Sequence, residues 1–150
     1  MPLTIAAESP LTADGRRLID GSQAALLDVF SPDEIFTFSP EELATPDVTF
    51  LVARDEDRAL ACVAMVDCGP YVEVKRLYVP AEGRGRGLAR AMMADLETRA
   101  RTAGKAQVML ETGDALVPAV ALYKTLGYRV RGPFGDYPAH PASLFMEKAL

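Results

Sequence analysis

The sequence predicts an α/β (α+β) domain in which a single mixed, mostly antiparallel sheet carries helices on both faces. Two patterns predict it. The first half holds short apolar stretches separated by tight turns, which is typical of antiparallel hairpins. The second half alternates strand and helix, which is typical of a parallel crossover. With 150 residues, of which 49% are hydrophobic, the chain can bury a sizeable core, and we expect one domain over 1–150.

The first 47 residues predict one strand and one long helix. Residues 3–7 form a short apolar run that suits a first strand. We expect a helix over 11–30, because its apolar residues recur near a 3.6-residue period: Leu18, Ile19, Ala25, Leu26 and Val29. Three prolines then punctuate the chain, and a short helix is expected over 41–44.

The next segment predicts a hairpin and a third strand. Residues 48–54 and 59–67 are two apolar stretches joined by the acidic turn 55–57. A Gly-Pro pair at 69–70 marks another turn. Residues 72–79 then read as a strand that leads into a glycine-rich turn.

The long helix expected over 88–103 follows this turn. Leu88, Met92 and Leu96 lie at positions i, i+4 and i+8, and Gly104 suits the residue after the helix.

The C-terminal third predicts a strand over 107–111 and a short helix over 118–126, with a proline in its first turn and a glycine after its end. Two final strands are expected over 128–131 and 144–148. Between them lies the stiff, turn-rich loop 132–141.

Composition excludes several classes of protein. The net charge of −5 argues against a general nucleic-acid binder. Basic side chains are concentrated in residues 71–150, which hold 12 of the 16. There is no apolar run long enough for a membrane span and no basic, signal-like start, so we expect a cytoplasmic protein. Cys62 and Cys68 lack metal-ligand spacing and read as reduced thiols, and His140 is the only histidine. We expect no metal.

The turn Arg84–Ala89 is the most informative segment. A glycine turn that opens a helix presents free N–H groups and the positive end of the helix dipole to an anion. It lacks the Gly-Lys-Ser/Thr of a Walker A loop. The Rossmann fingerprint fails as well, because Arg90 stands where its third glycine belongs. Arg84, Gly87 and Ala89 fit a third pattern, Arg/Gln-x-x-Gly-x-Gly/Ala.

That third pattern resembles the pyrophosphate loop of the GNAT acetyltransferases. A second GNAT-like motif lies 39 residues after Arg84, where Leu122-Tyr123 is followed by Gly127-Tyr128. One strand is expected between the two motifs, as in that fold. The resemblance covers about residues 48–150 well and the first 47 loosely. It implies the GNAT fold and acetyl-CoA as co-substrate.

The resemblance also implies roles for particular residues. The pantetheine arm would pair with the backbone of Leu77, Tyr78 and Val79, where an N–H could polarise the thioester oxygen. Tyr123 matches the general acid that protonates the leaving thiolate. The cofactor-binding set it implies in the loop and helix start is Arg84, Gly85, Arg86, Gly87, Leu88, Ala89 and Arg90. One departure is Leu116, which replaces an asparagine frequent in the family.

The general base is left open between several carboxylates and water. Glu73 is the first candidate, because some GNATs place a catalytic glutamate at this point of the strand beside the cofactor. Glu111 on the next strand is the alternative, and His140 has a suitable intrinsic pKa. A solvated Glu73 paired with Lys75 is an equally good interpretation of that residue.

By analogy, the acceptor pocket is lined by the early helices and the loop 132–141. Arg76, Asp136 and Tyr137 are candidate contacts there, and Arg76 could bind a substrate carboxylate or form a surface salt bridge. The expected activity is acetyl transfer to a primary amine of a small molecule, by direct attack in a ternary complex. Protein or peptide acetylation and a non-catalytic CoA-binding module are the alternatives, and a homodimer is common in such folds.

Overall fold

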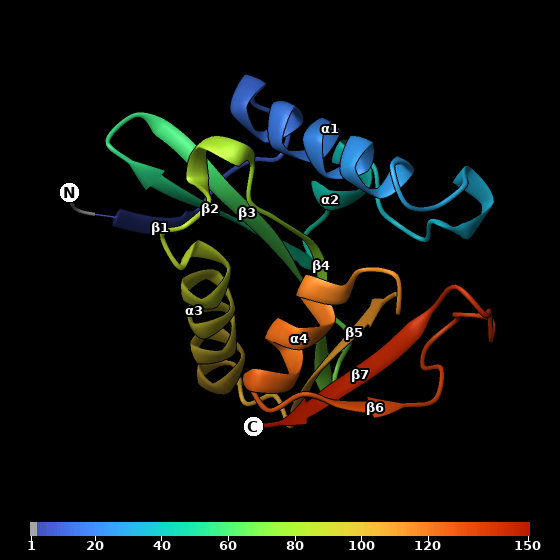
Figure 1. Ribbon diagram of the computed structural model, residues 1–150. Coiled ribbons are helices and arrows are strands. Elements are labelled where there is room, and N and C mark those ends of the chain that lie inside the picture. The colour runs from blue at the N-terminus through green and yellow to red at the C-terminus, as the bar shows by residue number, and fades with distance from the viewer. Residues whose placement is uncertain (1–2) are drawn as a thin grey trace.

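The computed structural model describes residues 3–150 as one seven-stranded sheet with helices on both of its faces (Figure 1). The elements follow in the order β1 Leu3–Ala7, α1 Ala13–Leu27, the 3₁₀ turn η1 Pro32–Glu34, α2 Pro40–Leu43, β2 Val48–Asp55, β3 Arg58–Asp67, β4 Tyr71–Tyr78, the 3₁₀ turn η2 Ala81–Gly83, α3 Leu88–Thr102, β5 Gln107–Thr112, α4 Val117–Thr125, β6 Arg129–Arg131 and β7 Leu144–Ala149. Each expected strand and helix is present, with small shifts of its ends. Within the described residues, no helix is long and apolar enough to cross a membrane.

The sheet has the strand order β1-β2-β3-β4-β5-β7-β6. Five of its neighbouring pairs are antiparallel, and only β4 and β5 run parallel. The parallel pair is the one joined by α3, because a parallel connection needs a crossover. The prediction of one mixed, mostly antiparallel sheet is therefore confirmed.

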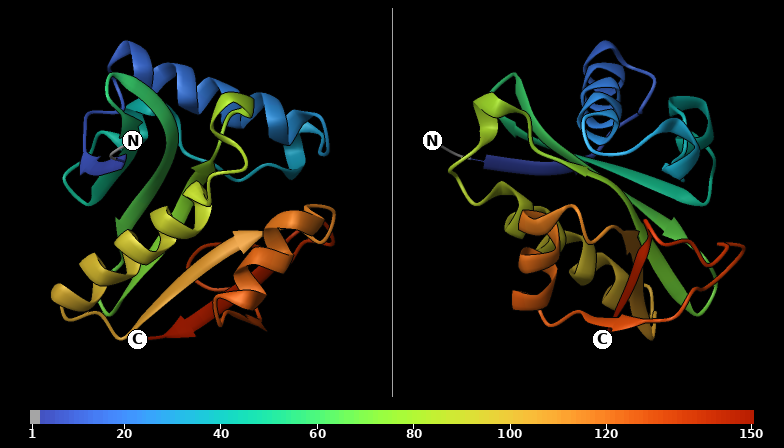
Figure 2. Two further views of the ribbon diagram at one scale, coloured as in Figure 1. Left: turned by 60° about the vertical axis from the view of Figure 1, so that its left-hand side comes forward. Right: turned by 45° about the vertical axis from the view of Figure 1, so that its right-hand side comes forward.

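Two apolar layers hold the helices to the sheet. On one face, α3 packs its buried stripe against the strands through Leu88, Met92, Met93 and Leu96, and Tyr123 of α4 joins the same cluster. On the other face, α1 and α2 cover the sheet (Figure 2). A third cluster, of Met109, Phe134 and Phe145, ties the loop after β6 to β5 and β7.

Helix α1 is shorter than expected at both ends. The Thr12 hydroxyl accepts a hydrogen bond from the Gly15 N–H, and this cap sets the first turn. At the other end the helix stops at Leu27, and Val29 is 45% exposed. The apolar periodicity was therefore misleading beyond Leu27, because the chain turns there and directs Phe30 toward the site described below.

The strands β4 and β5 part after a short parallel ladder. Their pairing runs from Tyr71 opposite Gln107 to Val74 opposite Leu110 and then ends. Beyond it the two strands diverge (Figure 2, left). A β-bulge at Arg76 and Leu77 shifts the register of β4 against β3, and Arg76 has a φ of 57°. The bulge and the fork place irregular backbone at the centre of the sheet.

Candidate active site

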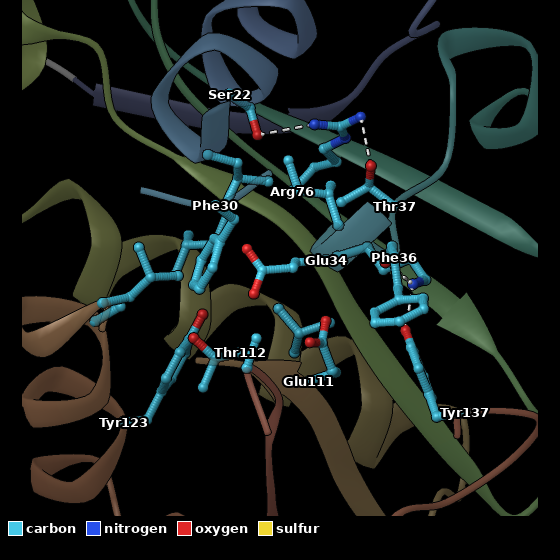
Figure 3. Close-up of a pocket in the computed structure, with 18 residues that line it drawn as sticks. Ser22, Phe30, Glu34, Phe36, Thr37, Arg76, Glu111, Thr112, Tyr123 and Tyr137 are labelled. Atoms are coloured by element: carbon cyan, nitrogen blue, oxygen red, sulfur yellow. Dashed lines mark hydrogen bonds between the residues drawn. The ribbon is translucent and has the colours of Figure 1, made fainter. Parts of the chain in front are cut away.

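A cavity of about 130 Å³ opens where β4 and β5 part (Figure 3). Five parts of the chain meet there: the bulged end of β4, the end of β5, the inner side of α4, the end of α1 with the segment that connects it to α2, and the loop between β6 and β7. Their lining side chains include Arg76, Glu111, Thr112, Tyr123, Phe30, Glu34, Phe36 and Tyr137. Since the first and last thirds of the chain both contribute walls, the cavity is a product of the tertiary fold.

Tyr123 lies on the wall of this cavity. The residue is 6% exposed and packs edge-to-face on Tyr128, with ring centroids 5.7 Å apart. Its hydroxyl points into the cavity, and the ring forms part of the wall (Figure 3). Burial raises the pKa of this phenol above its usual value, so it stays protonated at neutral pH. The side chain is thus held rigidly with its proton available.

Glu111 shares this cavity with Tyr123. It is the penultimate residue of β5, and its carboxyl group lies on the cavity wall (Figure 3). Burial raises its pKa to about 7, while the positive charge of Lys75 opposes that rise. A carboxylate that titrates near neutral pH is well suited to accept a proton from an amine.

Glu73 lies apart from Tyr123. It forms a buried ion pair with Lys75, with 3.3 Å between carboxylate oxygen and Nζ, and accepts a hydrogen bond from the Tyr137 hydroxyl. Glu73 lines a second, more open cavity together with Asp136, and Tyr137 lines both cavities. The first-choice pair, Glu73 with Tyr123, is therefore not brought into one cavity, whereas the alternative pair, Glu111 with Tyr123, is.

The expected anion site has the required backbone. Gly85 and Gly87 have φ values of 79° and 70°, in the left-handed region that favours glycine. Gly87 is the N-cap of α3 and has no side chain that could cap the helix. The first N–H groups of α3 therefore face outward without a side-chain acceptor. Gly83 is needed for a different reason, because a Cβ there would lie 2.4 Å from the Leu60 carbonyl oxygen.

The three arginines of this loop differ in their partners. The Arg84 side chain is exposed, and its one hydrogen bond to residues 3–150 is a long one of 3.4 Å from Nε to the Val79 carbonyl. Arg86 pairs with the buried carboxylate of Asp55 at 3.1 Å. Arg90 donates to the Thr125 hydroxyl at 3.1 Å. Arg84 is therefore the loop arginine with the most freedom to meet a phosphate.

The expected pantetheine contacts flank the bulge. Leu77 turns its side chain to the α3 face, while Tyr78 packs on the α1 face, where a Cβ on Gly21 would lie 2.8 Å from its ring. Val79 follows the strand end. The backbone of this segment lies beyond the β4–β5 ladder, so β5 leaves that edge open.

The remaining candidates have distinct places. Arg76 and Leu116 line the first cavity, and Leu116 offers an apolar side chain where asparagine is frequent in similar enzymes. Asp136 lines the second cavity, and Tyr137 stands between the two. His140 lines neither cavity as described. Its Nδ1 accepts a hydrogen bond from the Ala142 N–H, which is a role in the loop itself.

Sequence reasoning placed none of the first 47 residues in the cavity by name, although seven of them line it. Glu34 points into the cavity (Figure 3), and its carboxylate accepts a hydrogen bond from the Ser31 N–H at 2.9 Å. These bonds to Ser31 lower the pKa of Glu34. The Ser-x-x-Glu spacing of a capping box could have predicted the contact between Ser31 and Glu34. Phe30 and Phe36 carried no comparable signal, because an isolated aromatic residue is usually part of a core.

Comparison with known proteins tests the predicted family. The acetyltransferase (GNAT) family matches residues 17–128. The IAA acetyltransferase of Azospirillum brasilense is 39% identical over 99% of this chain and 98% of its own. A crystal structure of a Klebsiella pneumoniae protein assigned as an acyl-CoA N-acyltransferase has a TM-score of 0.81 and 31% identity, covering 99% of this chain and 97% of that one.

A further crystal structure, the PaiA N-acetyltransferase of Thermoplasma acidophilum in complex with coenzyme A, shares the fold with a TM-score of 0.78 at 16% identity over the whole of both chains. The resemblance inferred from the glycine turn and the Leu-Tyr helix is thus confirmed. The protein belongs to the GNAT acetyltransferase family and is an acyltransferase by that membership.

Proposed function

We propose that this protein transfers the acetyl group of acetyl-CoA to a primary amine of a small molecule, by direct attack within a ternary complex. One observation carries the proposal: a protonated phenol, Tyr123, and a carboxyl group with a pKa of about 7, Glu111, line one cavity at the fork of β4 and β5. These are the acid and the base that amine acetylation needs.

The chain offers a fitting cradle for acetyl-CoA. The uncapped start of α3, with Gly85 and Gly87 in left-handed conformations, suits the pyrophosphate, and Arg84 adds a free positive charge. The open edge of β4 over Leu77–Val79 suits the amides of the pantetheine arm. When bound, acetyl-CoA supplies the activated acetyl thioester.

The protein's own groups then manage two protons. The ionised carboxylate of Glu111 accepts a proton from the acceptor ammonium, directly or through one water, and frees the lone pair for attack. The Tyr123 hydroxyl donates its proton to the departing sulfur, and the second proton that the nitrogen loses on becoming an amide restores the phenol. Both groups sit in a partly water-excluded site, where their electrostatic effect is strengthened. Glu34 stays ionised and adds negative charge that favours an approaching ammonium.

A small acceptor is favoured over a peptide because aromatic side chains narrow the cavity. Phe36 and Tyr137 wall it on the side away from α4, and Phe30 covers it beside Tyr123 (Figure 3). A Cβ on Gly113 would meet Phe30 at 2.6 Å, which shows how closely the β5 end approaches this wall. The relative named for IAA, rather than for a protein substrate, gives further support. A peptide acceptor would require this wall to open, and a CoA-binding module would not need the Tyr123–Glu111 pair.

Two measurements test the proposal. Calorimetric titration with acetyl-CoA and CoA is expected to give saturable binding that weakens in Arg84→Ala but not in Arg129→Ala, a matched change at an 80% exposed arginine on β6. Thiol release with a panel of small amines, and mass spectrometry with a panel of peptides, then identify the acceptor class. Acetylation of peptides alone would overturn the small-molecule assignment, and binding without turnover on either panel would favour the non-catalytic module.

A further inference from the structure

Arg76 is a buried cation on the wall of the active-site cavity. The residue is 9% exposed, and it lines the cavity together with Ser22 and Thr37. Its backbone has a φ of 57° in the β4 bulge, a conformation that is uncommon for a residue with a long side chain. Such outliers persist where the surrounding structure enforces them, and they cluster at binding sites.

The guanidinium group is held only by neutral oxygens. Nη1 donates to the Ser22 hydroxyl at 3.3 Å, and Nη2 donates to the Thr37 hydroxyl at 3.0 Å. Nε and Nη2 both donate to the Phe38 carbonyl, at 3.2 and 3.1 Å. Since a guanidinium carries five N–H groups, one hydrogen on Nη1 remains for another acceptor.

No anion of the described chain neutralises this charge. Arg76 forms no salt bridge among residues 3–150. The nearby Cys62 is no counterion, because burial raises the pKa of its thiol to about 12. Asp20 and Glu42 exert only a longer-range attraction, and Glu42 is bound to the Ser39 N–H at 2.9 Å. Buried charges in proteins are normally paired, so an unpaired one beside a ligand cavity points to a ligand anion.

We propose that the amine acceptor carries a carboxylate, and that Arg76, flanked by the hydroxyls of Ser22 and Thr37, binds it. The inference rests on the proposed function and narrows its acceptor to the amino-acid class. Arginine between two hydroxyl groups provides charge and directed donors for a carboxylate. This end of the cavity lies across from Glu111 and Tyr123 (Figure 3), so a carboxylate held here leaves the amine free to face them.

A structural role for Arg76 makes a different prediction. The guanidinium also ties the Thr37–Phe38 segment to α1 through Ser22. If that were its only task, replacing it would lower activity on all acceptors equally. The ratio of activities on matched acceptors with and without a carboxylate therefore separates the two roles, whatever happens to the absolute rate.

The test measures thiol release from acetyl-CoA with pairs of acceptors that differ only by the carboxylate: glycine and methylamine, phenylalanine and phenethylamine, 4-aminobutyrate and propylamine. For at least one pair, kcat/KM is expected to favour the amino acid by roughly 10- to 100-fold, as a charge-assisted hydrogen bond provides. Arg76→Gln is expected to bring that ratio near one, and Arg76→Lys to an intermediate value. Arg129→Gln, a change at an exposed arginine, should leave it unaltered.

A binding measurement needs no turnover and no variant. The thermal unfolding midpoint of the wild type with CoA should rise with N-acetylglycine or N-acetylphenylalanine and less with the matched acetamides. Acetylation of amines with no preference for the carboxylate, or an unchanged ratio in folded Arg76→Gln, would overturn this inference while leaving the proposed function intact. Turnover of none of these acceptors, with no stabilisation by any acetylated product, would instead count against both.

Discussion

Replacing Glu111 by Gln is the sharpest perturbation of the proposed mechanism. Gln keeps the size of the side chain and removes its ability to accept a proton. Because burial raises the pKa of Glu111 to about 7, the wild-type enzyme should gain activity as this group ionises. Below pH 7 its rate is expected to fall about tenfold for each pH unit, with a plateau above pH 8. In Glu111→Gln this loss of rate below pH 7, the acidic limb of the pH profile, should vanish. The rate at pH 8 should fall about 100- to 10,000-fold.

The same substitution should change stability in the opposite direction. A pKa that rises on folding, from 4.5 to about 7, means that the ionised carboxylate destabilises the folded protein. Below pH 4.5 the carboxyl group is protonated in the folded and the unfolded protein, and the full free energy of unfolding is present. That free energy falls as the pH rises through 7, because the folded protein then ionises a buried group. At pH 8, Glu111→Gln should therefore unfold at a higher temperature than the wild type. The gain in the free energy of unfolding is at most about 3 kcal/mol and smaller where solvent screens the carboxylate. At pH 4 the two should match.

The assay is kcat for thiol release at saturating acceptor, from pH 5.5 to 9, beside thermal unfolding at pH 4 and pH 8. An acceptor amine adds its own titration at higher pH, and that limb should persist in the variant. Glu147→Gln is the matched control, because Glu147 pairs with Arg131 on the neighbouring strand and lines neither cavity as described. A Glu111→Gln enzyme with full activity and an unaltered pH profile would refute the assignment of the base.

Four further predictions follow from the site. Tyr123→Phe should lower kcat about 100-fold or more and leave acetyl-CoA affinity in calorimetry unchanged; an unchanged kcat would remove its acid role. Gly87→Ala should cost about 1–2 kcal/mol of stability and weaken CoA binding, whereas Gly69→Ala, with a similar φ of 85° in a remote turn, should cost stability alone. Glu73→Gln should lower the unfolding temperature by leaving its buried lysine partner unpaired, yet keep the activity limb near pH 7; loss of that limb would restore Glu73 as the base. Arg86→Ala should weaken CoA binding and also destabilise the fold by about 1–3 kcal/mol, because it leaves the buried carboxylate of Asp55 without its partner. Equal stability of Arg86→Ala and wild type would contradict that pairing.

The sequence alone predicted the sheet and most element boundaries because their signals are local. Alternating apolar stretches, the turn at Glu56 and the glycine after α3 each determine structure within a few residues. The end of α1 was misjudged because Val29 continues an apolar period that the tertiary structure does not use. The two motifs that identified the family are local as well, since each consists of neighbouring residues in the sequence.

The choice of base was beyond local reasoning. Glu73 and Glu111 lie on adjacent strands, and both are acidic residues near the segment expected to hold acetyl-CoA. What separates them is which cavity each carboxylate enters and whether a cation holds it, and both depend on side chains far away in sequence, such as Tyr137. The contribution of Glu34 and Phe30 was hidden for the same reason. The sequence could not predict that Arg76 lacks an anionic partner either, because the distance from Arg76 to each carboxylate depends on the folded chain.

The account's central claim is that acetyl transfer occurs at the fork of β4 and β5, between Glu111 and Tyr123. A crystal structure with CoA and an acceptor analogue tests it most directly. The account predicts the pyrophosphate on the N–H groups at the start of α3, the sulfur within hydrogen-bonding reach of the Tyr123 hydroxyl, and the acceptor nitrogen facing Glu111 directly or through one water. A sulfur remote from Tyr123, or an acceptor seated in the second cavity beside Glu73, would contradict it.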